Sequence, residues 1–169
     1  MPSRLAYRTR QFWNALPGTR KRVETEALLP HLTPTQIVLF RRMQRSEQTH
    51  ALQVLNRLKA AGQIDPDLLS AALLHDVGKV LFPITIFDRV VIVLGKSIFP
   101  RLAGRWSEGT PDRFRRPFVV AAHHPGWGAD LAEQACASHR TVELIRHHQD
   151  IPSKDDQLLT ALQAADDEN

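Results

Sequence analysis

Helix-capping signals recur along the whole sequence, and they constrain the fold more than any other feature. Residues 33–36 (Thr-Pro-Thr-Gln) have the form of a capping box with proline in the first turn, which predicts a helix start. The apolar positions that follow predict one helix as far as Gly62, a C-terminal cap. Asp65-Pro66 and Ser138 predict further starts. Because alternation of β-branched residues is nearly absent, we expect an all-α helical bundle.

The segments between these signals are also predicted to be helical, with two interruptions. Residues 80–99 form the most hydrophobic stretch, but proline, glycine and charged residues interrupt it. A membrane-spanning helix needs about 20 mostly apolar residues, so this stretch does not qualify as one. We expect a core helix there, ending near Pro100, and then a loop with a short helical piece over 101–117. Residues 118–124 and 131–137 are predicted helices. The turn between them, Pro125-Gly126-Trp127-Gly128, is the second interruption.

The length and charge distribution predict one domain with an extension. The chain has 169 residues, and we expect one helical domain over 33–169 after a basic extension over 1–32, helical and packed on the domain. Residues 1–22 contain six basic and no acidic side chains, so the arm could also attract nucleic acid or anionic lipid. The single cysteine, Cys136, excludes an internal disulfide. With no apolar signal segment at the start, we expect a cytoplasmic protein.

The most informative motif is His75-Asp76-Val77-Gly78-Lys79, at the end of a strongly apolar run. The adjacent imidazole and carboxylate suit a divalent metal ion, and the two oxygens of Asp76 could bridge two ions. Gly78 removes a side chain where substrate or another helix must approach. The ammonium of Lys79, one helical turn beyond His75, could contact a phosphate. We therefore expect Asp76 and Lys79 to be catalytic residues.

One dyad cannot complete a metal site, so other ligands are expected on other predicted helices. His123 and His124 compete for one ligand position, because neighbouring helical residues point about 100° apart. Both members of the pair His147-His148 could be ligands, or one could support the other. Asp166 and Asp167 pose a similar choice, and the apolar register of the last helix favours Asp166. That helix is predicted to start at Ser153, with Asp156 three residues later. The predicted metal ligands are therefore His50, His75, Asp76, one of His123 and His124 (His124 in the resemblance described next), His147, His148 and Asp166.

The order of these residues resembles the HD-domain metal-dependent phosphohydrolase superfamily, whose minimal pattern is His, then His-Asp, then a distal Asp. The resemblance covers residues 33–167 and places that pattern on His50, His75-Asp76 and Asp166. The segment His124-Pro125 with Gly128, followed by His147-His148, is similar to the HD-GYP branch, and it implies a two- or three-metal centre. The chain departs from that branch after the His-His pair, where it reads Gln149-Asp150-Ile151-Pro152 and lacks the Gly-Tyr-Pro tripeptide.

The resemblance implies an HD-like helical bundle with a metal site between its helices and a metal-dependent phosphohydrolase activity. The expected cofactor is one or two divalent ions, chosen among Mn, Fe, Ni, Co, Mg and Zn. The expected substrate is a phosphorylated small molecule or nucleotide, cleaved as a mono- or diester by a metal-activated hydroxide. The alternatives are a cyclic-dinucleotide phosphodiesterase of degenerate HD-GYP type, a di-iron HD-type oxygenase and a non-catalytic regulatory HD module. Nucleic acid is a further possible partner, through the basic arm.

Overall fold

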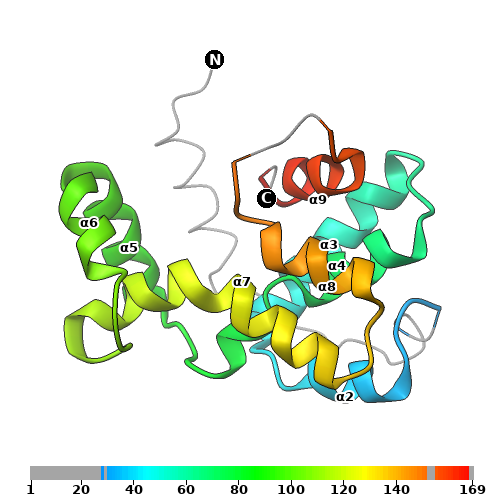
Figure 1. Cartoon of the computed structure of the whole chain (residues 1–169), viewed down its shortest axis with the longest axis horizontal. Coiled ribbons are helices and arrows are strands. Elements are labelled where there is room, and N and C mark those ends of the chain that lie inside the picture. Colours follow the sequence, from blue (N-terminus) through cyan, green and yellow to red (C-terminus); the bar gives the residue numbers. More distant parts are fainter. Residues whose placement is uncertain (1–27, 29, 152–154, 168–169) are drawn as a thin grey trace. The chain divides into compact units, whose positions relative to one another are not determined.

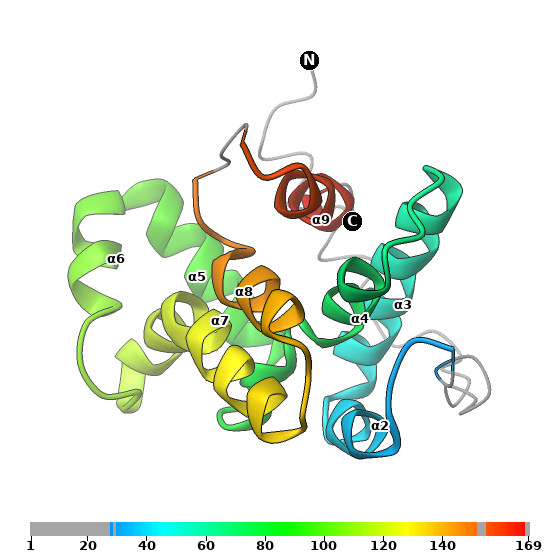
Figure 2. The ribbon, with the colours of Figure 1, turned by 45° about the vertical axis from the view of Figure 1, so that its right-hand side comes forward.

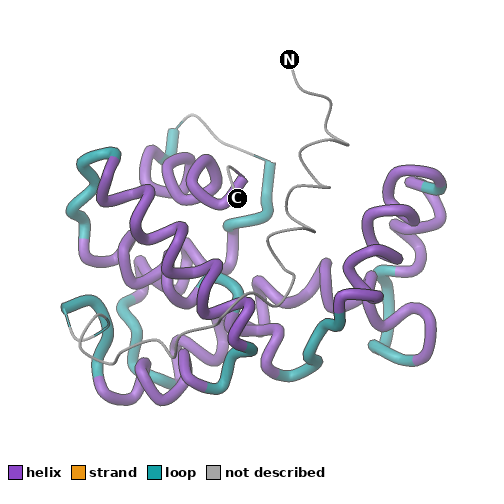
Figure 3. The backbone as a smooth tube through the Cα atoms, turned by 180° about the vertical axis from the view of Figure 1, so that it is seen from behind, coloured by secondary structure: helices purple, strands orange, loops and turns teal. Residues whose placement is uncertain are grey.

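The computed structural model describes residue 28, residues 30–151 and residues 155–167. Every regular element in these residues is helical, as Figure 3 shows, so the predicted all-α fold is confirmed. Most of the predicted extension over 1–32 lies outside the described residues. None of the helices in the described part of the chain is long and apolar enough to cross a membrane. The elements are α2 (Pro34–Arg41), α3 (Arg45–Ala60), α4 (Pro66–Leu74), η2 (Val77–Val80), α5 (Ile86–Ile98), α6 (Pro100–Trp106), η3 (Arg113–Arg115), α7 (Arg116–Gln134), α8 (His139–His147) and α9 (Gln157–Asp167).

The chain divides into two compact units. The main unit contains the described residues up to Leu81 and those from His124 onward, and the insert unit contains residues 82–123. In the main unit α3, α4, α8 and α9 pack against one another, as Figures 1 and 2 show. Helix α4 is the most buried of them: Leu68 and Leu69 in its first turn and 71–74 in its second half are all nearly inaccessible to solvent. The His75-Asp76 motif therefore follows directly after a helix that lies in the core.

Local capping explains where several helices begin and end. Thr33 and the side chain of Gln36 form the predicted capping box of α2, and the Asp65 carboxylate accepts a hydrogen bond from the Leu68 N–H at the start of α4. Helix α3 ends at Ala60, and Gly62, with a φ of +78°, permits the turn that closes it. There the N–H groups of Gly62 and Gln63 donate to carbonyls of the last helical turn.

The predicted long helix over 33–62 is wrong, because the chain breaks it into α2 and α3. Gln44 adopts an extended conformation between them. The Gln48 side chain donates to the carbonyl oxygens of Met43, at 2.9 Å, and Arg41, at 3.3 Å. These two bonds satisfy carbonyls that the interrupted helix leaves without backbone partners.

The predicted turn at Pro125-Gly126-Trp127-Gly128 is also wrong, because α7 runs through it as a continuous helix. The glycines there have no left-handed backbone; among the described residues, positive φ at glycine occurs at Gly62 and Gly109. Gly128 instead permits a close packing contact, since a Cβ at this position would lie 3.1 Å from the backbone nitrogen of Gly78. The glycine that resembles a turn signal is thus a contact surface for η2.

The start of the last helix differs from the prediction as well. Ser153 lies outside the described residues, and α9 begins at Gln157. The residue that caps it is Asp156, whose carboxylate accepts a hydrogen bond from the Leu159 N–H at 3.0 Å. Asp156 also pairs with Arg140 of α8, which ties the start of α9 to its neighbour.

The insert unit consists of α5, α6, η3 and the beginning of α7. Phe118 is its most buried large side chain, and it packs on Gly95 of α5 and against the ring of Trp106 at a centroid distance of 5.1 Å. The prediction of a loop with a short helical piece over 101–117 agrees with the structure, in which α6 and η3 supply the helical residues. The helix predicted within 80–99 forms as α5, but it is not a core helix, because Gly95 is its one buried residue.

Candidate metal centre

The end of α4 presents His75 and Asp76 to the interior of the main unit. His75 is the C-cap of α4, and Asp76 follows it at the start of η2. Both side chains are buried. His75 Nδ1 lies 3.0 Å from the carbonyl oxygen of Ala72, so the ring N–H there donates to the backbone and Nε2 carries the lone pair. This is the state in which an imidazole ligates a metal ion.

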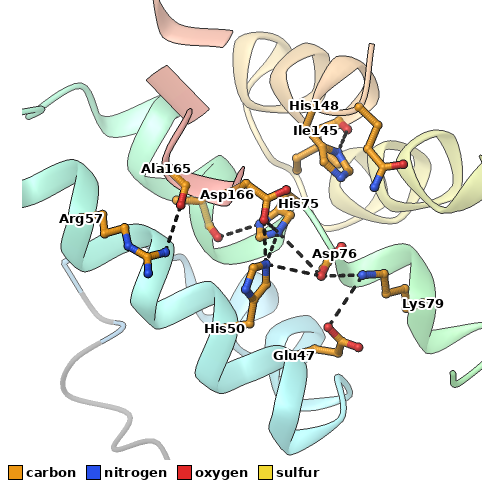
Figure 4. A network of polar contacts seen from close by, with 12 residues as sticks. Glu47, His50, Arg57, His75, Asp76, Lys79, Ile145, His148, Ala165 and Asp166 are labelled. Carbon is orange, nitrogen blue, oxygen red and sulfur yellow. Dashed lines mark hydrogen bonds and ion pairs between the residues drawn. The ribbon is translucent and has the colours of Figure 1, made fainter. Parts of the chain in front are cut away.

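A first group of possible ligands forms around His75. His50 of α3 brings its Nε2 to 3.1 Å from His75 Nε2, and Asp166 of α9 brings its Oδ1 to 2.8 Å from His50 Nε2 and 3.6 Å from His75 Nε2. Figure 4 shows these side chains converging from three helices. Arg57 of α3 donates to the carbonyl oxygen of Ala165 at 3.1 Å, which fixes α9 beside α3 next to Asp166.

A second group lies beside the first and consists of Asp76, His124 and His148. His124 of α7 places its Nε2 3.2 Å from Asp76 Oδ1. His148 directly follows α8, and its Nδ1 lies 2.7 Å from the carbonyl oxygen of Ile145. The ligand atoms within each group lie within 4.8 Å of one another, and all three side chains of this second group are buried.

Asp76 joins the two groups. Its Oδ1 faces His124 at 3.2 Å, whereas its Oδ2 lies 3.8 Å from His50 Nε2 and 3.7 Å from His75 Nε2. One carboxylate therefore directs one oxygen toward each group. This arrangement matches the bridging role that its two oxygens allow.

The surroundings keep His148 neutral and Asp76 and Asp166 ionised, and these are the protonation states that bind cations. Burial lowers the pKa of His148 to about 3, so this ring is neutral at pH 7. Burial alone would raise the pKa of Asp76, but the Lys79 ammonium and the neighbouring imidazoles hold it well below its usual range. Burial has the same tendency at Asp166, and the charges and hydrogen bond of His75 and His50 outweigh it, so the pKa of Asp166 is also lowered.

The pKa of His50 is raised, whereas that of His148 is lowered. Burial acts to lower the pKa of His50, but the hydrogen bond to Asp166 and the negative charges of Asp76 and Asp166 outweigh it, so the pKa is raised. The carboxylates that favour a proton on this ring equally favour a metal cation in its place. The first group thus has the negative potential that a divalent ion requires.

The donor set fits divalent metal ions. His148 Nε2 is buried and has no hydrogen-bond partner among the described residues, although it points toward the other rings of the cluster. A buried polar atom without a partner is costly unless something binds it. Imidazole nitrogens combined with carboxylate oxygens are typical ligands of Mn, Fe, Co, Ni and Zn. Each of the two groups could therefore hold a divalent metal ion, and Asp76, a member of the second group, also faces the first.

Lys79 forms ion pairs with Asp76 and Glu47 at the edge of this centre. Lys79 Nζ lies 2.7 Å from Asp76 Oδ2 and 3.8 Å from Glu47 Oε2. Glu47 is buried on α3, one helical turn before His50. Glu47 was not among the predicted site residues, although its spacing of three from His50 places both side chains on one face of the helix. Gln149, whose Nε2 lies 3.4 Å from His124 Nε2, was not predicted either.

The structure separates the neighbouring histidines that the sequence left ambiguous. His147, predicted as a ligand, lies apart from both groups: its side chain is 48% exposed and its Nδ1 lies 2.7 Å from Asp150 Oδ2. The reason is the rotation of about 100° per helical residue, which turns His148 inward and His147 outward. His123 is likewise exposed, with its Nε2 3.0 Å from the Ser107 carbonyl oxygen, whereas the adjacent His124 lies in the cluster.

The close approach of η2 and α7 brings His124 to Asp76. A Cβ on Gly78 would lie 2.0 Å from the carbonyl oxygen of His124 and 2.7 Å from the backbone nitrogen of Gly128. Only glycine permits this distance, because real Cβ contacts are not shorter than about 3 Å. The glycine of the His-Asp-x-Gly-Lys motif therefore admits another helix, one of the two roles predicted for it.

The comparisons with known proteins identify the kind of domain. A family model described as HD domain matches residues 48–168, which is most of the chain and includes every member of both metal groups. No curated protein and no solved structure matched the chain.

Proposed function

Because the chain belongs to the HD-domain family, we propose that it is a metal-dependent phosphohydrolase that cleaves a nucleotide or another phosphate mono- or diester. The observation that supports this most is the pair of adjacent ligand triads, with one oxygen of Asp76 directed toward each. His50, His75 and Asp166 would hold one divalent ion, and Asp76, His124 and His148 would hold the other. When bound, such ions supply Lewis acidity and lower the pKa of water toward neutrality.

The chain's own residues prepare the centre for this chemistry. The backbone carbonyls of Ala72 and Ile145 hold the N–H of His75 and His148, so both rings offer Nε2 to the centre. The surrounding core of α3, α4 and α8 keeps these donors rigid. Asp76 remains ionised at neutral pH, since its pKa lies well below the usual range, and it can orient a nucleophile between the groups.

Lys79 supports phosphoester hydrolysis over oxidation. Its ammonium sits at the edge of the metal centre beside Asp76, where it can neutralise charge on a phosphoryl oxygen. Glu47 contacts the same ammonium and positions it from α3. We therefore place Lys79 as the electrostatic catalyst and Glu47 as its positioning residue.

The test combines metal content with turnover. Purified protein is subjected to elemental analysis and is then assayed with Mn, Fe, Ni, Co and Mg on aryl phosphate mono- and diesters and on nucleotides. We expect up to two ions per chain and release of phosphate or of the ester alcohol. Dioxygen-dependent turnover without phosphate release would favour an oxidative enzyme, and bound metal without any turnover would favour a regulatory module.

Two neighbouring histidines give a matched control for this experiment. His124→Ala removes a ligand of the second group and should lower both metal content and turnover. His123→Ala changes the adjacent, exposed ring and should leave both unaltered. Lys79→Ala should retain metal but lose about a hundredfold in turnover, as for loss of a charge-stabilising donor. Equal behaviour of the two histidine variants, or full turnover by the lysine variant, would contradict the assignment.

A further inference from the structure

Exposed apolar side chains gather in the insert unit. Seven of the eleven exposed large hydrophobic residues in the described part of the chain lie within residues 82–123, although the main unit is the larger one. These seven are Ile86, Phe87, Leu94, Ile98, Phe99, Leu102 and Phe114. A soluble surface shows such residues singly, whereas their accumulation on one element indicates an interaction site.

Three of these residues share one face of α5. Phe87, Leu94 and Ile98 are spaced by seven and four, which places them on the same side of an α-helix. They are 75%, 50% and 60% exposed, so this α5 face is directed to solvent along the whole helix. Helix α5 packs instead through Gly95, where the ring of Phe118 occupies the space that a side chain would take. The α5 face therefore remains uncovered by the described part of the chain.

The insert unit also carries a net positive charge. Residues 82–123 contain seven basic side chains (Arg89, Lys96, Arg101, Arg105, Arg113, Arg115 and Arg116) and three acidic ones (Asp88, Glu108 and Asp112), which is a formal charge of +4. On α5 itself, Arg89 and Lys96 lie about 180° to 200° around the helix from Phe87. Helix α5 thus combines an exposed apolar face with a basic face.

This combination selects among possible occupants. A second copy of the chain would bring two units of like charge together, which opposes association. Nucleic acid would contact the cations and leave the apolar face in water, because phosphate recognition rests on Lys and Arg. An anionic lipid surface satisfies both features, since apolar side chains enter the acyl boundary while the cations on the polar face are attracted by the negative surface potential. Helix α5 has 13 residues and is about 20 Å long, which suits a helix lying in the interface.

We propose that the insert unit binds membranes containing anionic lipids through the α5 face, with α5 parallel to the surface. Phe87, Leu94 and Ile98 insert at the level of the headgroups and the first methylenes. The positive charge of the unit attracts it to the negative potential of the lipid surface. The proposal rests on surface chemistry alone and is independent of the metal centre and of the proposed hydrolysis.

Vesicle sedimentation with the full chain tests this inference. The vesicles are pure phosphatidylcholine, or phosphatidylcholine with about one-third phosphatidylglycerol. We expect at least about tenfold stronger binding to the anionic vesicles. Raising the salt from about 0.1 M to about 1 M, which shortens the Debye length from about 10 Å to about 3 Å, should weaken it. Absence of binding to anionic vesicles, or equal binding to both compositions, would overturn the proposal.

A triple variant locates the binding on the α5 face. Phe87→Ser with Leu94→Ser and Ile98→Ser should reduce vesicle binding about tenfold or more, while helicity and metal content stay unchanged. The matched control replaces three exposed apolar residues of the main unit, Val38, Ile64 and Ile151, by serine and should bind as the wild type. Unaltered binding by the α5 variant would assign the interaction to another segment, such as the basic N-terminal arm. A wild-type dimer that the α5 variant converts to monomers, without vesicle binding by either, would assign the face to self-association.

Discussion

Replacing Gly78 by alanine should damage both stability and metal binding, because the new methyl group has no space. Its Cβ would lie 2.0 Å from the carbonyl oxygen of His124 and 2.7 Å from the nitrogen of Gly128, both backbone atoms of α7. Restoring ordinary contact distances requires η2 and α7 to separate by about 1 Å or more. Overpacking of this kind costs about 1–3 kcal/mol, and rigid backbone on both sides places the expected loss near 3 kcal/mol.

Urea unfolding at pH 7 measures this loss, and elemental analysis measures its effect on the site. For a chain of this length about 3 kcal/mol corresponds to a fall in Tm of roughly 6–12 °C. Because Gly78 and Asp76 belong to one short segment, separating it from α7 lengthens the 3.2 Å approach of Asp76 to His124. We therefore expect weaker metal binding in the second group as well.

Two other glycines provide a graded control for the same argument. A Cβ at Gly128 would meet its nearest atom at 3.1 Å, so Gly128→Ala should cost about 1 kcal/mol. Gly104 of α6 has no atom within 4 Å of such a Cβ, and Gly104→Ala should stabilise by up to about 1 kcal/mol through helix propensity. A free energy of unfolding for Gly78→Ala within about 0.5 kcal/mol of the wild type would refute the reasoning.

Three further predictions concern residues that the structure distinguishes. His148→Ala should lower the metal content by one ion whereas His147→Ala should not, and elemental analysis of both variants would contradict the ligand assignment if they behaved alike. Asp156→Ala should destabilise the protein by about 1 kcal/mol at pH 7 through loss of the α9 cap. The hydrogen bond from Arg140 lowers the pKa of Asp156, so this contribution is complete above about pH 4, the pKa in the unfolded chain, and is lost as the pH falls through the folded value. Urea midpoints of variant and wild type should thus differ at pH 7 and converge in acid; a constant gap would argue against the ion pair. Cys136 closes α7 with a φ of +57°, so Cys136→Gly should raise the free energy of unfolding by about 0.5–1 kcal/mol, and a destabilised variant would show that the thiol matters more than the backbone.

The sequence predicted features that depend on neighbouring residues. The capping box at Thr33, the start of α4 at Asp65 and the closing turn at Gly62 are set by side chains within a few positions. His75 and Asp76 were accessible for the same reason, because they are adjacent and follow an apolar helix. Local chemistry determines all of these features, and tertiary packing has only to preserve them.

The features that escaped prediction depend on partners far along the chain. Gly128 resembles a turn residue until Gly78 is placed against it, and this contact joins residues fifty positions apart. The burial of Glu47 reflects its contact with Lys79 on another element. Which of His147 and His148 points inward depends on where α8 ends, and helix ends are uncertain by one or two residues in any sequence pattern.

The candidate ligands of the first group lie on α3, at the end of α4 and on α9, and these elements are far apart in the sequence. Before α9 packs against the rest of the main unit, this group contains the two imidazoles but not the Asp166 carboxylate. An ion that binds the folded chain and not the unfolded one adds stability by mass action, about 2.7 kcal/mol at a hundredfold excess over its Kd. We therefore expect the metal ion to bind after the last helix has docked, and to stabilise the contact between the early and late parts of the chain. Removal of the ion by a chelator should then lower the urea midpoint for unfolding of the whole main unit.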